Sequence, residues 1–344
     1  MSERVPPKPV AFGRVPIVDG HPVAVVAEIG VNHEGDAAVC ARMIEAAKGA
    51  GAHFAKLQII DAEKNYAPGT ASYQIFSRAW LAPEAVAGLF RYAREIGIEI
   101  FATTGDPDTL VWVDRLKPAG HKISSGLLTH LPLIAMAART GRPLMMSAGM
   151  AEDAEVVEAL AAARGASGIV LLHCTSIYPA PVEELHLKAI GRMAERYRVP
   201  VGYSDHTLGV EIPVLAVAAG AVAIEKHFTL DASREGFDHG ISLEPKTFAE
   251  MTAGIRKATA ALGSATKPLS EAERRSAQLN HRYIVAARDL PSGHRIADRD
   301  IAYLRLPPEA ARGLQPRDAA NVIGRRLRAS LQRFTAIKAD NLES

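Results

Sequence analysis

The stretch that decides the fold runs from residue 201 to residue 228 and reads VGYSDHTLGVEIPVLAVAAGAVAIEKHF. It contains two apolar runs of strand length, which end near His206 and His227, and the alanine- and valine-rich residues 210–219 between them suit a short crossover helix. This order predicts one βαβ unit. Because parallel strands end at the same edge of a sheet, side chains at both carboxyl ends face one crevice, where α/β proteins bind ligands.

His206 and His227 are therefore placed where they could hold one metal ion. The spacing alone is weak, since a single histidine is more often a hydrogen-bonded structural residue. Their neighbours favour a functional site: Asp205 precedes one histidine, and Glu225 and Lys226 precede the other inside an otherwise apolar strand.

The same alternation extends along most of the chain. Helical patterns such as AAVCARMIEAAKGAGA separate apolar runs of the kind that is buried on both faces. Eight such runs follow one another: VAVVAEIG, HFAKLQII, IEIFATT, GHKISSG, PLMMSAGM, GIVLLHCT, VPVGYSDHT and AVAIEKHF. We therefore predict an α/β fold in which residues 1–262 form a closed (β/α)8 TIM barrel.

Composition indicates a globular enzyme-sized protein. The chain has 344 residues, is 48% hydrophobic and carries a formal charge of only +2, so we expect no nucleic-acid or membrane partner. Cys40 and Cys174 lie far apart and form no CxxC pair, and neither a charged-then-apolar leader nor a run of 18 apolar residues is visible. We expect free thiols and a cytoplasmic location.

Polar side chains gather at the predicted strand ends, where a barrel carries its chemistry. They are Glu28, Lys56, Gln58, Thr103, Thr104, Lys122, Ser124, Ser125, Ser147, His173, Thr175, Ser176, Asp205, His206, Glu225 and His227. A buried lysine without an anionic partner costs several kcal/mol, so Lys56 and Lys122 indicate an anion between them. The alternative is that both lysines form structural ion pairs with Glu28 and Glu225.

The character of the chain changes after the predicted barrel. Residues 263–282 are polar and predict a linker with a short helix, and residues 283–344 alternate very short strands with turn residues. This second part predicts a small β-rich module that is marginal alone and docked on something else. Its RRLRASLQR run is either a solvated face or a group of cations near an anionic site of a neighbouring subunit.

Several strings, taken in order, resemble one family, the sialic acid synthases. They are AEIGVNHEGD, FAKLQ, HKISSG, PLMMSAGM, LLHCTSIYP, GYSDHTLG, AIEKHF and FDHGISLEP, with VAARDLPSGHRI and VIGRRL near the end. The resemblance covers about residues 10–340 and implies a barrel joined to an antifreeze-like SAF domain, which in the family covers the partner's active site in a domain-swapped homodimer. It also implies an enzyme that condenses phosphoenolpyruvate with an aldose, N-acetylmannosamine or a related hexose derivative, to give a nonulosonic acid and phosphate.

The resemblance also implies roles for individual residues. Glu28 matches the acid that handles the attacking water, and His206 and His227 match ligands of a divalent metal, usually Mn²⁺, with Mg²⁺ or Co²⁺ as other candidates. Residues matching the phosphoenolpyruvate contacts are Lys56, Thr103, Lys122, Ser125, Ser147, Ser176 and Ser204. Residues matching the sugar contacts are Gln58, Tyr178, Asp238 and Arg305.

Three positions depart from the family pattern on the acceptor side. Leu127 stands where sialic acid synthases usually carry Glu, Thr70 where they tend to have Asn, and Leu306 where they tend to have Arg, although Arg305 is adjacent. These departures predict an acceptor sugar other than N-acetylmannosamine.

Two other functions remain open at this point. One is a non-catalytic sugar- or phosphate-binding barrel, which would not need a Lewis-acid site. The other is a different phosphoenolpyruvate-dependent synthase, such as a 3-deoxy-octulosonate synthase, which the attached terminal module disfavours.

Overall fold

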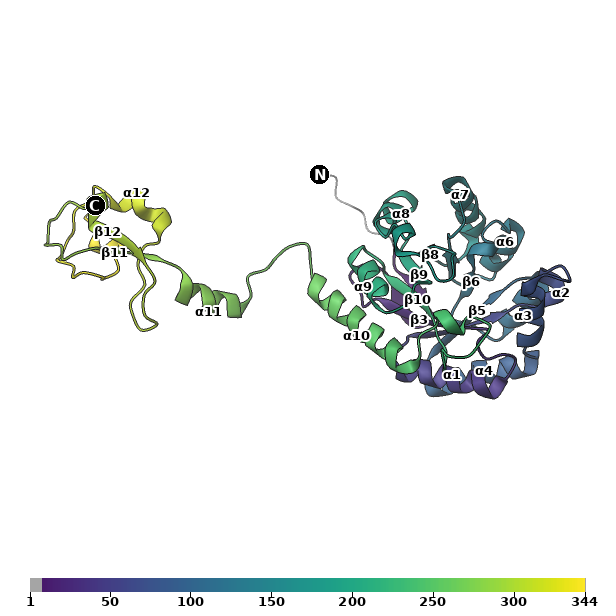
Figure 1. Cartoon of the computed structure of the whole chain (residues 1–344). Helices are drawn as coiled ribbons and strands as arrows, with labels where there is room; N and C mark the ends of the chain where they lie inside the picture. Colours follow the sequence, from purple (N-terminus) through teal and green to yellow (C-terminus); the bar gives the residue numbers. More distant parts are fainter. Residues whose placement is uncertain (1–7, 344) are drawn as a thin grey trace. The chain divides into compact units, whose positions relative to one another are not determined.

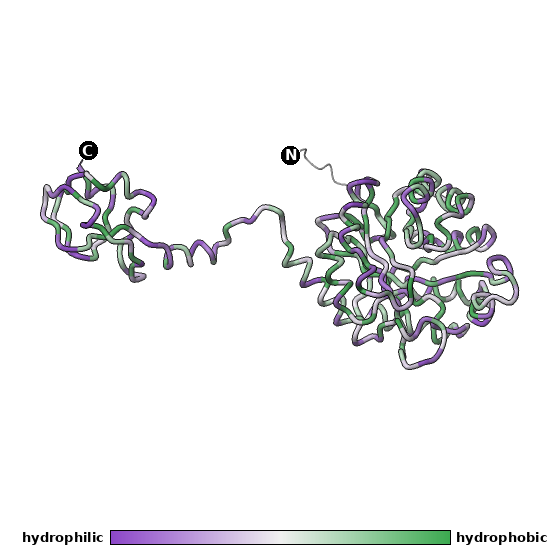
Figure 2. The backbone as a smooth tube through the Cα atoms, turned by 45° about the horizontal axis from the view of Figure 1, so that its top comes forward, coloured by the Kyte–Doolittle hydropathy of each residue, from purple (hydrophilic) through white to green (hydrophobic). Residues whose placement is uncertain are grey.

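The computed structural model describes residues 8–343, and the chain divides into two compact units, Met1–Gly263 and Ser264–Ser344 (Figure 1). The sequence placed the end of the barrel at residue 262 and a linker at 263–282. In the structure a long helix, α10, ends at Leu262, and helix α11 (Glu271–Asn280) lies within the expected linker. Helix α11 has no buried residue in the described structure and is hydrophilic along most of its length (Figure 2).

The first unit contains a closed parallel barrel, which confirms the predicted TIM-barrel fold. Its order is β10-β3-β4-β5-β6-β7-β8-β9, so the last strand pairs with the first. The strands are β3 (Ala24–Gly30), β4 (Phe54–Ile59), β5 (Glu99–Thr104), β6 (His121–Ile123), β7 (Leu144–Ser147), β8 (Ile169–Cys174), β9 (Val201–Asp205) and β10 (Ala223–His227). Each of them lies within one of the eight predicted segments.

Helices connect and surround these strands. They are α1 (Ala37–Gly49), α4 (Pro83–Ile96), α5 (Pro107–Arg115), α6 (Leu131–Arg139), α7 (Asp153–Ala162), α8 (Ala189–Tyr197), α9 (Glu211–Ala218) and α10 (Pro245–Leu262). The connection from β4 to α4 holds two further helices, α2 (Ala62–Asn65) and α3 (Ala71–Ala79). The predicted crossover at residues 210–219 is α9, so the βαβ unit inferred from the sequence is present.

An N-terminal hairpin closes the barrel at the strand starts. Strands β1 (Val10–Phe12) and β2 (Val15–Ile17) pair antiparallel. The fully buried ring of Phe12 packs edge-on against Phe54 and Phe101, with ring centroids 5.8 and 5.0 Å away. This apolar cluster fills the barrel at that end, and the cleft formed by the described residues lies at the other end.

Strand alternation divides the barrel interior into an apolar and a polar half. On β10, Ala223 belongs to the apolar cluster at the strand starts, whereas Glu225 and His227 line a cleft at the strand ends. Successive side chains of a strand point to opposite faces, so Lys226 points outward. The barrel interior is therefore packed with apolar side chains at the strand starts and carries polar and charged side chains at the strand ends, as is usual for this fold.

The second unit is small and rich in loops. Strands β11 (Tyr283–Ala286) and β12 (Ile301–Leu304) pair antiparallel, and a short helix, α12 (Ala319–Val322), packs on the same core. The Asp300 side chain is 1% exposed and binds Arg288 and His294. No helix in residues 8–343 is long and apolar enough to cross a membrane.

Candidate active site

A cleft of about 270 Å³ opens at the C-terminal ends of the barrel strands. Eleven of the fourteen residues that the sequence predicted for the site line it: Glu28, Lys56, Gln58, Lys122, Ser125, Ser147, Ser176, Tyr178, Ser204, His206 and His227. The other three are Thr103, Asp238 and Arg305. Barrel closure explains the gathering, because it places His227 of β10 directly beside Glu28 of β3.

Four buried charges form the floor of the cleft. Lys56 bridges Glu28 and Glu225, with its Nζ 3.5 Å from Glu225 Oε2, and Lys122 Nζ lies 3.4 Å from Glu225 Oε1. All four side chains are at most 5% exposed. The ion pairs of the alternative interpretation are thus present, but they face a cleft.

The lysines retain donor capacity beyond these pairs. An ammonium group has three N–H donors. Within the described residues, Lys56 Nζ pairs with two carboxylates, and Lys122 Nζ with Glu225 and the hydroxyl of Ser147 at 2.7 Å. Each ammonium therefore has one further N–H to offer to an anion in the cleft.

Small hydroxyl side chains lie close to the lysines. Thr103 lies beside Lys122 on the neighbouring strand, is 1% exposed, and its Oγ1 has no hydrogen-bond partner among residues 8–343. The Gly149 N–H donates to Ser125 Oγ at 3.1 Å, and a Cβ at Gly149 would lie 2.3 Å from Ser176 Oγ. Glycine is therefore needed there to keep both hydroxyl groups accessible.

Burial and mutual attraction set the protonation of the floor. Burial raises the pKa of Glu28, only partly offset by Lys56, and lowers the pKa of Lys122. Burial also opposes ionisation of Glu225, but Lys122 and Lys56 outweigh it and lower the pKa of Glu225 to about 2. A carboxyl group with a raised pKa in a cleft, like Glu28, is suited to proton transfer.

The two histidines lie together at the rim. Their ring centroids are 5.4 Å apart, and His206 Nδ1 lies 2.9 Å from the carbonyl oxygen of Thr175. With the proton of the neutral ring on Nδ1, where this carbonyl accepts it, Nε2 is the nitrogen that could bind a metal. Burial, followed by the proximity of His206, lowers the pKa of His227, so its ring is neutral at physiological pH.

These two imidazoles fit a shared metal ion. His227 Nδ1 is buried and accepts or donates no hydrogen bond within the described chain, and Asp238 Oδ2 lies 3.5 Å from it. No cluster of three or more His, Cys, Asp or Glu side chains that could hold a metal occurs in residues 8–343. Two imidazole ligands would leave open positions for water and a substrate oxygen.

Polar groups on the other side of the cleft suit a sugar. Gln58 Nε2 donates to Glu28 Oε1 at 2.8 Å, and the Tyr178 ring lies 4.1 Å from that of His206. Asp238 is placed at the rim by the buried Asn32, whose Oδ1 accepts from the Asp238 N–H at 3.0 Å. Asn32 was not predicted as part of the site.

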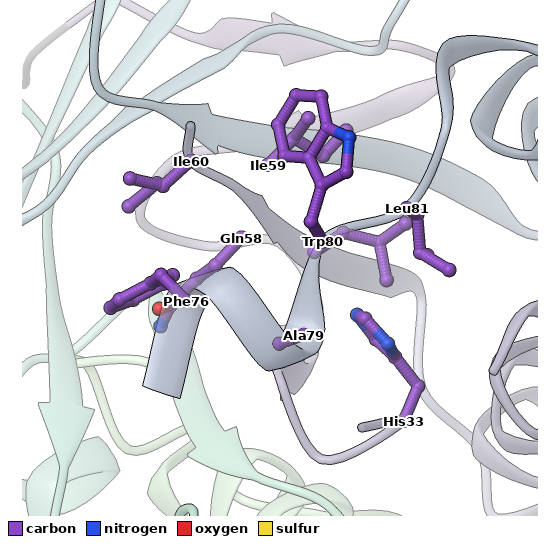
Figure 3. A pocket seen from close by; sticks show the side chains of 9 residues that line it. His33, Gln58, Ile59, Ile60, Phe76, Ala79, Trp80 and Leu81 are labelled. Atoms are coloured by element: carbon purple, nitrogen blue, oxygen red, sulfur yellow. The ribbon is translucent and has the colours of Figure 1, made fainter. Parts of the chain in front are cut away.

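The helices α2 and α3 add an apolar flank that the sequence analysis did not include in the site. Tyr66 and Phe76 stack with ring centroids 5.2 Å apart and line the cleft together with Ile60. Behind this flank is a cavity of about 10 Å³, room for one water molecule, which is bordered by Gln58, Ile60, Phe76 and His33 (Figure 3). Burial lowers the pKa of His33 to about 4.

The departures from the family pattern have different structural consequences. Leu127 packs against the barrel core while Gly126 lines the cleft, so no carboxylate reaches the cleft from this turn. The Thr70 side chain caps helix α3, accepting from the Tyr73 N–H at 3.2 Å, and does not line the cleft. Leu306 lines a pocket of the second unit.

One predicted residue lies in the second unit, and two residues that were not assigned to the site line the cleft. Arg305 follows β12 on the exposed surface of the second unit. Glu225 and Cys174 line the cleft although neither was assigned to the site. The strand-end rule did single out Glu225, whereas Cys174 is a free, buried thiol 3.8 Å from His206 Nδ1.

The fold and the site define the class of the protein. A closed (β/α)8 barrel whose strand ends combine buried lysines, a carboxyl group with a raised pKa and paired histidines is an enzyme of the TIM-barrel class. Residues 43–267 match the NeuB family and residues 281–343 match the SAF domain. The chain belongs to the NeuB family. Its named relatives are synthases of nonulosonic acids.

Individual relatives agree with this assignment. An N,N'-diacetyllegionaminic acid synthase of Legionella pneumophila is 35% identical over 93% of this chain and 94% of its own. The N-acetylneuraminate-9-phosphate synthase of Mus musculus is 30% identical over 94% of both chains. The crystal structure of an N-acetylneuraminic acid synthetase from Leptospira borgpetersenii, in complex with citrate, is 31% identical with a TM-score of 0.76 over 79% of this chain and 96% of that one.

Proposed function

We propose that the protein condenses phosphoenolpyruvate with an aldose and releases phosphate, forming a nonulosonic acid. The observation that carries the proposal is the pair of buried lysines, Lys56 and Lys122, each with an unused N–H beside a cleft that also presents two histidines. Family membership supports the reaction class, since the relatives are named as synthases of such acids.

Phosphoenolpyruvate suits the lysine side of the cleft. Its phosphate and carboxylate are strong acceptors, and charge-assisted hydrogen bonds are about twice as strong as neutral ones. Thr103 Oγ1 would gain the partner that it lacks among the described residues, and Ser125 and Ser176 add short donors.

The aldose suits the rim. A divalent ion held by His206 and His227, Mn²⁺ being our choice, would act as a Lewis acid that polarises the carbonyl group of the acceptor. Gln58, Tyr178 and Asp238 offer donors and acceptors for its hydroxyl groups. Arg305 is proposed as a further contact from the SAF domain of a partner subunit.

The bonds change in three steps. The methylene carbon of phosphoenolpyruvate attacks the aldehyde carbon, forming the C–C bond. The aldehyde oxygen takes the electron pair of the C=O bond and a proton from solvent, and an oxocarbenium centre is left at C2. Water adds to C2 and its proton passes to Glu28, whose raised pKa makes it a competent acceptor. The bond between C2 and the phosphate oxygen then breaks, and the proton of the C2 hydroxyl leaves with the phosphate, which gives the 2-keto acid.

The acceptor is proposed to differ from N-acetylmannosamine. The apolar flank of Ile60, Tyr66 and Phe76 would leave a buried hydroxyl group unpaired, which costs about 1–3 kcal/mol, whereas a methyl or acyl group gains from burial. No carboxylate is present at Leu127 to bind sugar hydroxyl groups. A hexose with acylamino groups, such as the two N-acetyl groups in the name of the Legionella enzyme's product, fits this flank.

We further propose a domain-swapped homodimer in the cytoplasm. The SAF domain exposes Tyr303, Leu304 and Phe334, which a partner surface would cover. Free cysteines at positions 40 and 174 support a reducing compartment. Mixing a His206→Ala full-length chain with a wild-type chain truncated after residue 282 tests the swap. Activity restored at one site supports it, and demonstrated heterodimers without activity contradict it.

The central experiment is phosphate release from phosphoenolpyruvate with a panel of aldoses and Mn²⁺, followed by a mass spectrum of the product. Mannose, N-acetylmannosamine and 2,4-diacetamido-2,4,6-trideoxyhexoses cover increasing acylation and deoxygenation. The proposal expects a product with the mass of phosphoenolpyruvate plus aldose plus water minus phosphoric acid.

The outcomes separate the alternatives. Phosphoenolpyruvate binding without turnover on any aldose would favour a non-catalytic binding barrel. Turnover confined to pentose or tetrose phosphates would favour a different 3-deoxy-ulosonate synthase. Equal turnover of mannose and the acylated sugars would contradict the apolar flank as the selective element.

A further inference from the structure

A second charge pair lies on the same two strands as the site but points away from it. Asp205 and Lys226 stand directly opposite each other on β9 and β10. Their neighbours along the strands, Ser204 with His206 and Glu225 with His227, line the cleft. By strand alternation, the pair therefore lies on the outer face of the barrel wall.

The contacts of this pair enclose His206. Lys226 Nζ lies 2.5 Å from Asp205 Oδ2 and also donates to the carbonyl oxygen of Thr207. The Thr207 N–H donates to Asp205 Oδ1 at 3.2 Å, and its hydroxyl lies 3.0 Å from both carboxylate oxygens. One ammonium group thus binds the residue before His206 and the residue after it, and belongs to the residue before His227.

The pair is difficult to explain as a stabilising element. Both side chains are 0% exposed. Removing two charges from water costs solvation that their attraction need not return, and apolar replacements of such pairs are often neutral or stabilising. A buried network of this kind, in which every charged group has a partner, instead fixes one geometry.

We infer that Lys226 and Asp205 are positioning residues that hold the two histidine rings at the separation a shared metal ion requires. The inference rests on the proposed function, because the role of Lys226 and Asp205 is to fix the two histidines that would bind the metal ion. Outer partners of metal ligands commonly change metal affinity about 10- to 100-fold when they are removed.

The test removes both charges together. The double variant Asp205→Asn/Lys226→Met keeps an acceptor for Thr207 and leaves no lone buried charge. The dissociation constant for Mn²⁺, measured by electron paramagnetic resonance of the free ion, should rise about 10- to 100-fold. The unfolding temperature should stay near or above that of the wild type, and phosphoenolpyruvate should bind the metal-free protein unchanged.

A milder variant and a matched control accompany it. Thr207→Val removes only the hydroxyl link to Asp205, and should raise the Mn²⁺ dissociation constant about 2- to 10-fold. The control Asp153→Asn/Arg196→Met removes an ion pair between α7 and α8 whose side chains are 50% and 52% exposed, and should leave Mn²⁺ binding unchanged.

The outcomes distinguish this inference from the proposed function. Wild-type protein that binds no Mn²⁺ would remove the metal assignment and this role with it. Wild-type protein that binds Mn²⁺, with equal affinity in both test variants, would remove the positioning role alone. Parallel loss of Mn²⁺ binding, phosphoenolpyruvate binding and thermal stability in the double variant would show a general structural role and also overturn the inference.

Discussion

Glu225 in the barrel and Asp300 in the second unit are both buried carboxylates, yet their surroundings differ. Burial by itself would raise the pKa of each carboxyl group. Nearby donors and cations outweigh this effect and lower the pKa of both to about 2. Asp300 accepts from Arg288, from His294 at 2.7 Å and from the Ala297 N–H at 2.9 Å. Glu225 instead shares its two lysines with a cleft of about 270 Å³.

The difference shows how a structural charge cluster can be told from a functional one. The donors around Asp300 come from residues 288–297 of its own loops and bind the carboxylate directly, so the cluster fixes those loops. Around Glu225 the two lysines border a cleft, and Thr103 Oγ1 lacks a partner within residues 8–343. Cations that border a cleft can still donate to an anionic ligand, whereas those around Asp300 bind the carboxylate alone.

The largest expected effect is at the rim of the barrel cluster. His227→Ala or His206→Ala should abolish Mn²⁺-dependent condensation, a loss on the order of a thousandfold or more, because Lewis-acid polarisation supplies several kcal/mol. Activity is measured by phosphate release, and circular dichroism checks the fold. Full activity of both variants after chelation would sink the metal hypothesis.

Glu28→Gln should lower kcat about a hundredfold or more, because the attacking water loses its proton acceptor. Glutamine keeps an oxygen that can accept from Gln58. The KM for phosphoenolpyruvate should change little, and steady-state kinetics separate the two constants. A variant with normal kcat would show that another group takes the proton.

Lys56→Met should weaken phosphoenolpyruvate binding by about 2 kcal/mol, or about thirtyfold, since Lys122 must then bind the anion alone. The matched control is Arg288→Met, which removes a cation from the Asp300 cluster. It should lower the stability of the second unit without changing phosphoenolpyruvate affinity. Calorimetric titration below the unfolding temperature measures the phosphoenolpyruvate affinity of both variants. Equal affinities for the two variants would erase the distinction between the clusters.

The smallest effect is on stability alone. The pKa of Asp300 is lowered in the folded protein, so its contribution is present above the ordinary carboxyl pKa near 4 and is lost as pH falls towards 2. We expect about 2 kcal/mol of stability in the second unit to disappear across this range. Hydrogen exchange of peptides covering residues 283–304 reports it. Asp300→Asn should start less stable and show a smaller acid-dependent loss, whereas an unchanged pH profile would exclude Asp300 as its source.

Particular residues show how far the sequence could be interpreted. The eight apolar runs predicted all eight barrel strands, because buried parallel strands leave a continuous local signal. The rule that chemistry lies at strand ends selected Glu28, Lys56, Lys122, His206 and His227, all of which line the cleft, because each stands within or directly after one of these runs. The rule could not find Tyr66 and Phe76, since α2 and α3 lie within a connection whose path depends on packing.

The sequence by itself determined the alternation of strands and helices, the polar strand ends and the change in character after the barrel, because these depend on periodicity and composition over short spans. Only the tertiary structure decided which charges meet. Glu225 and Lys226 are adjacent in one apolar strand, yet one joins the lysine cluster of the cleft and the other pairs with Asp205 on the outer face. Strand alternation separates them, and barrel closure brings together residues far apart in the sequence, such as Glu28 and His227, which are 199 positions apart.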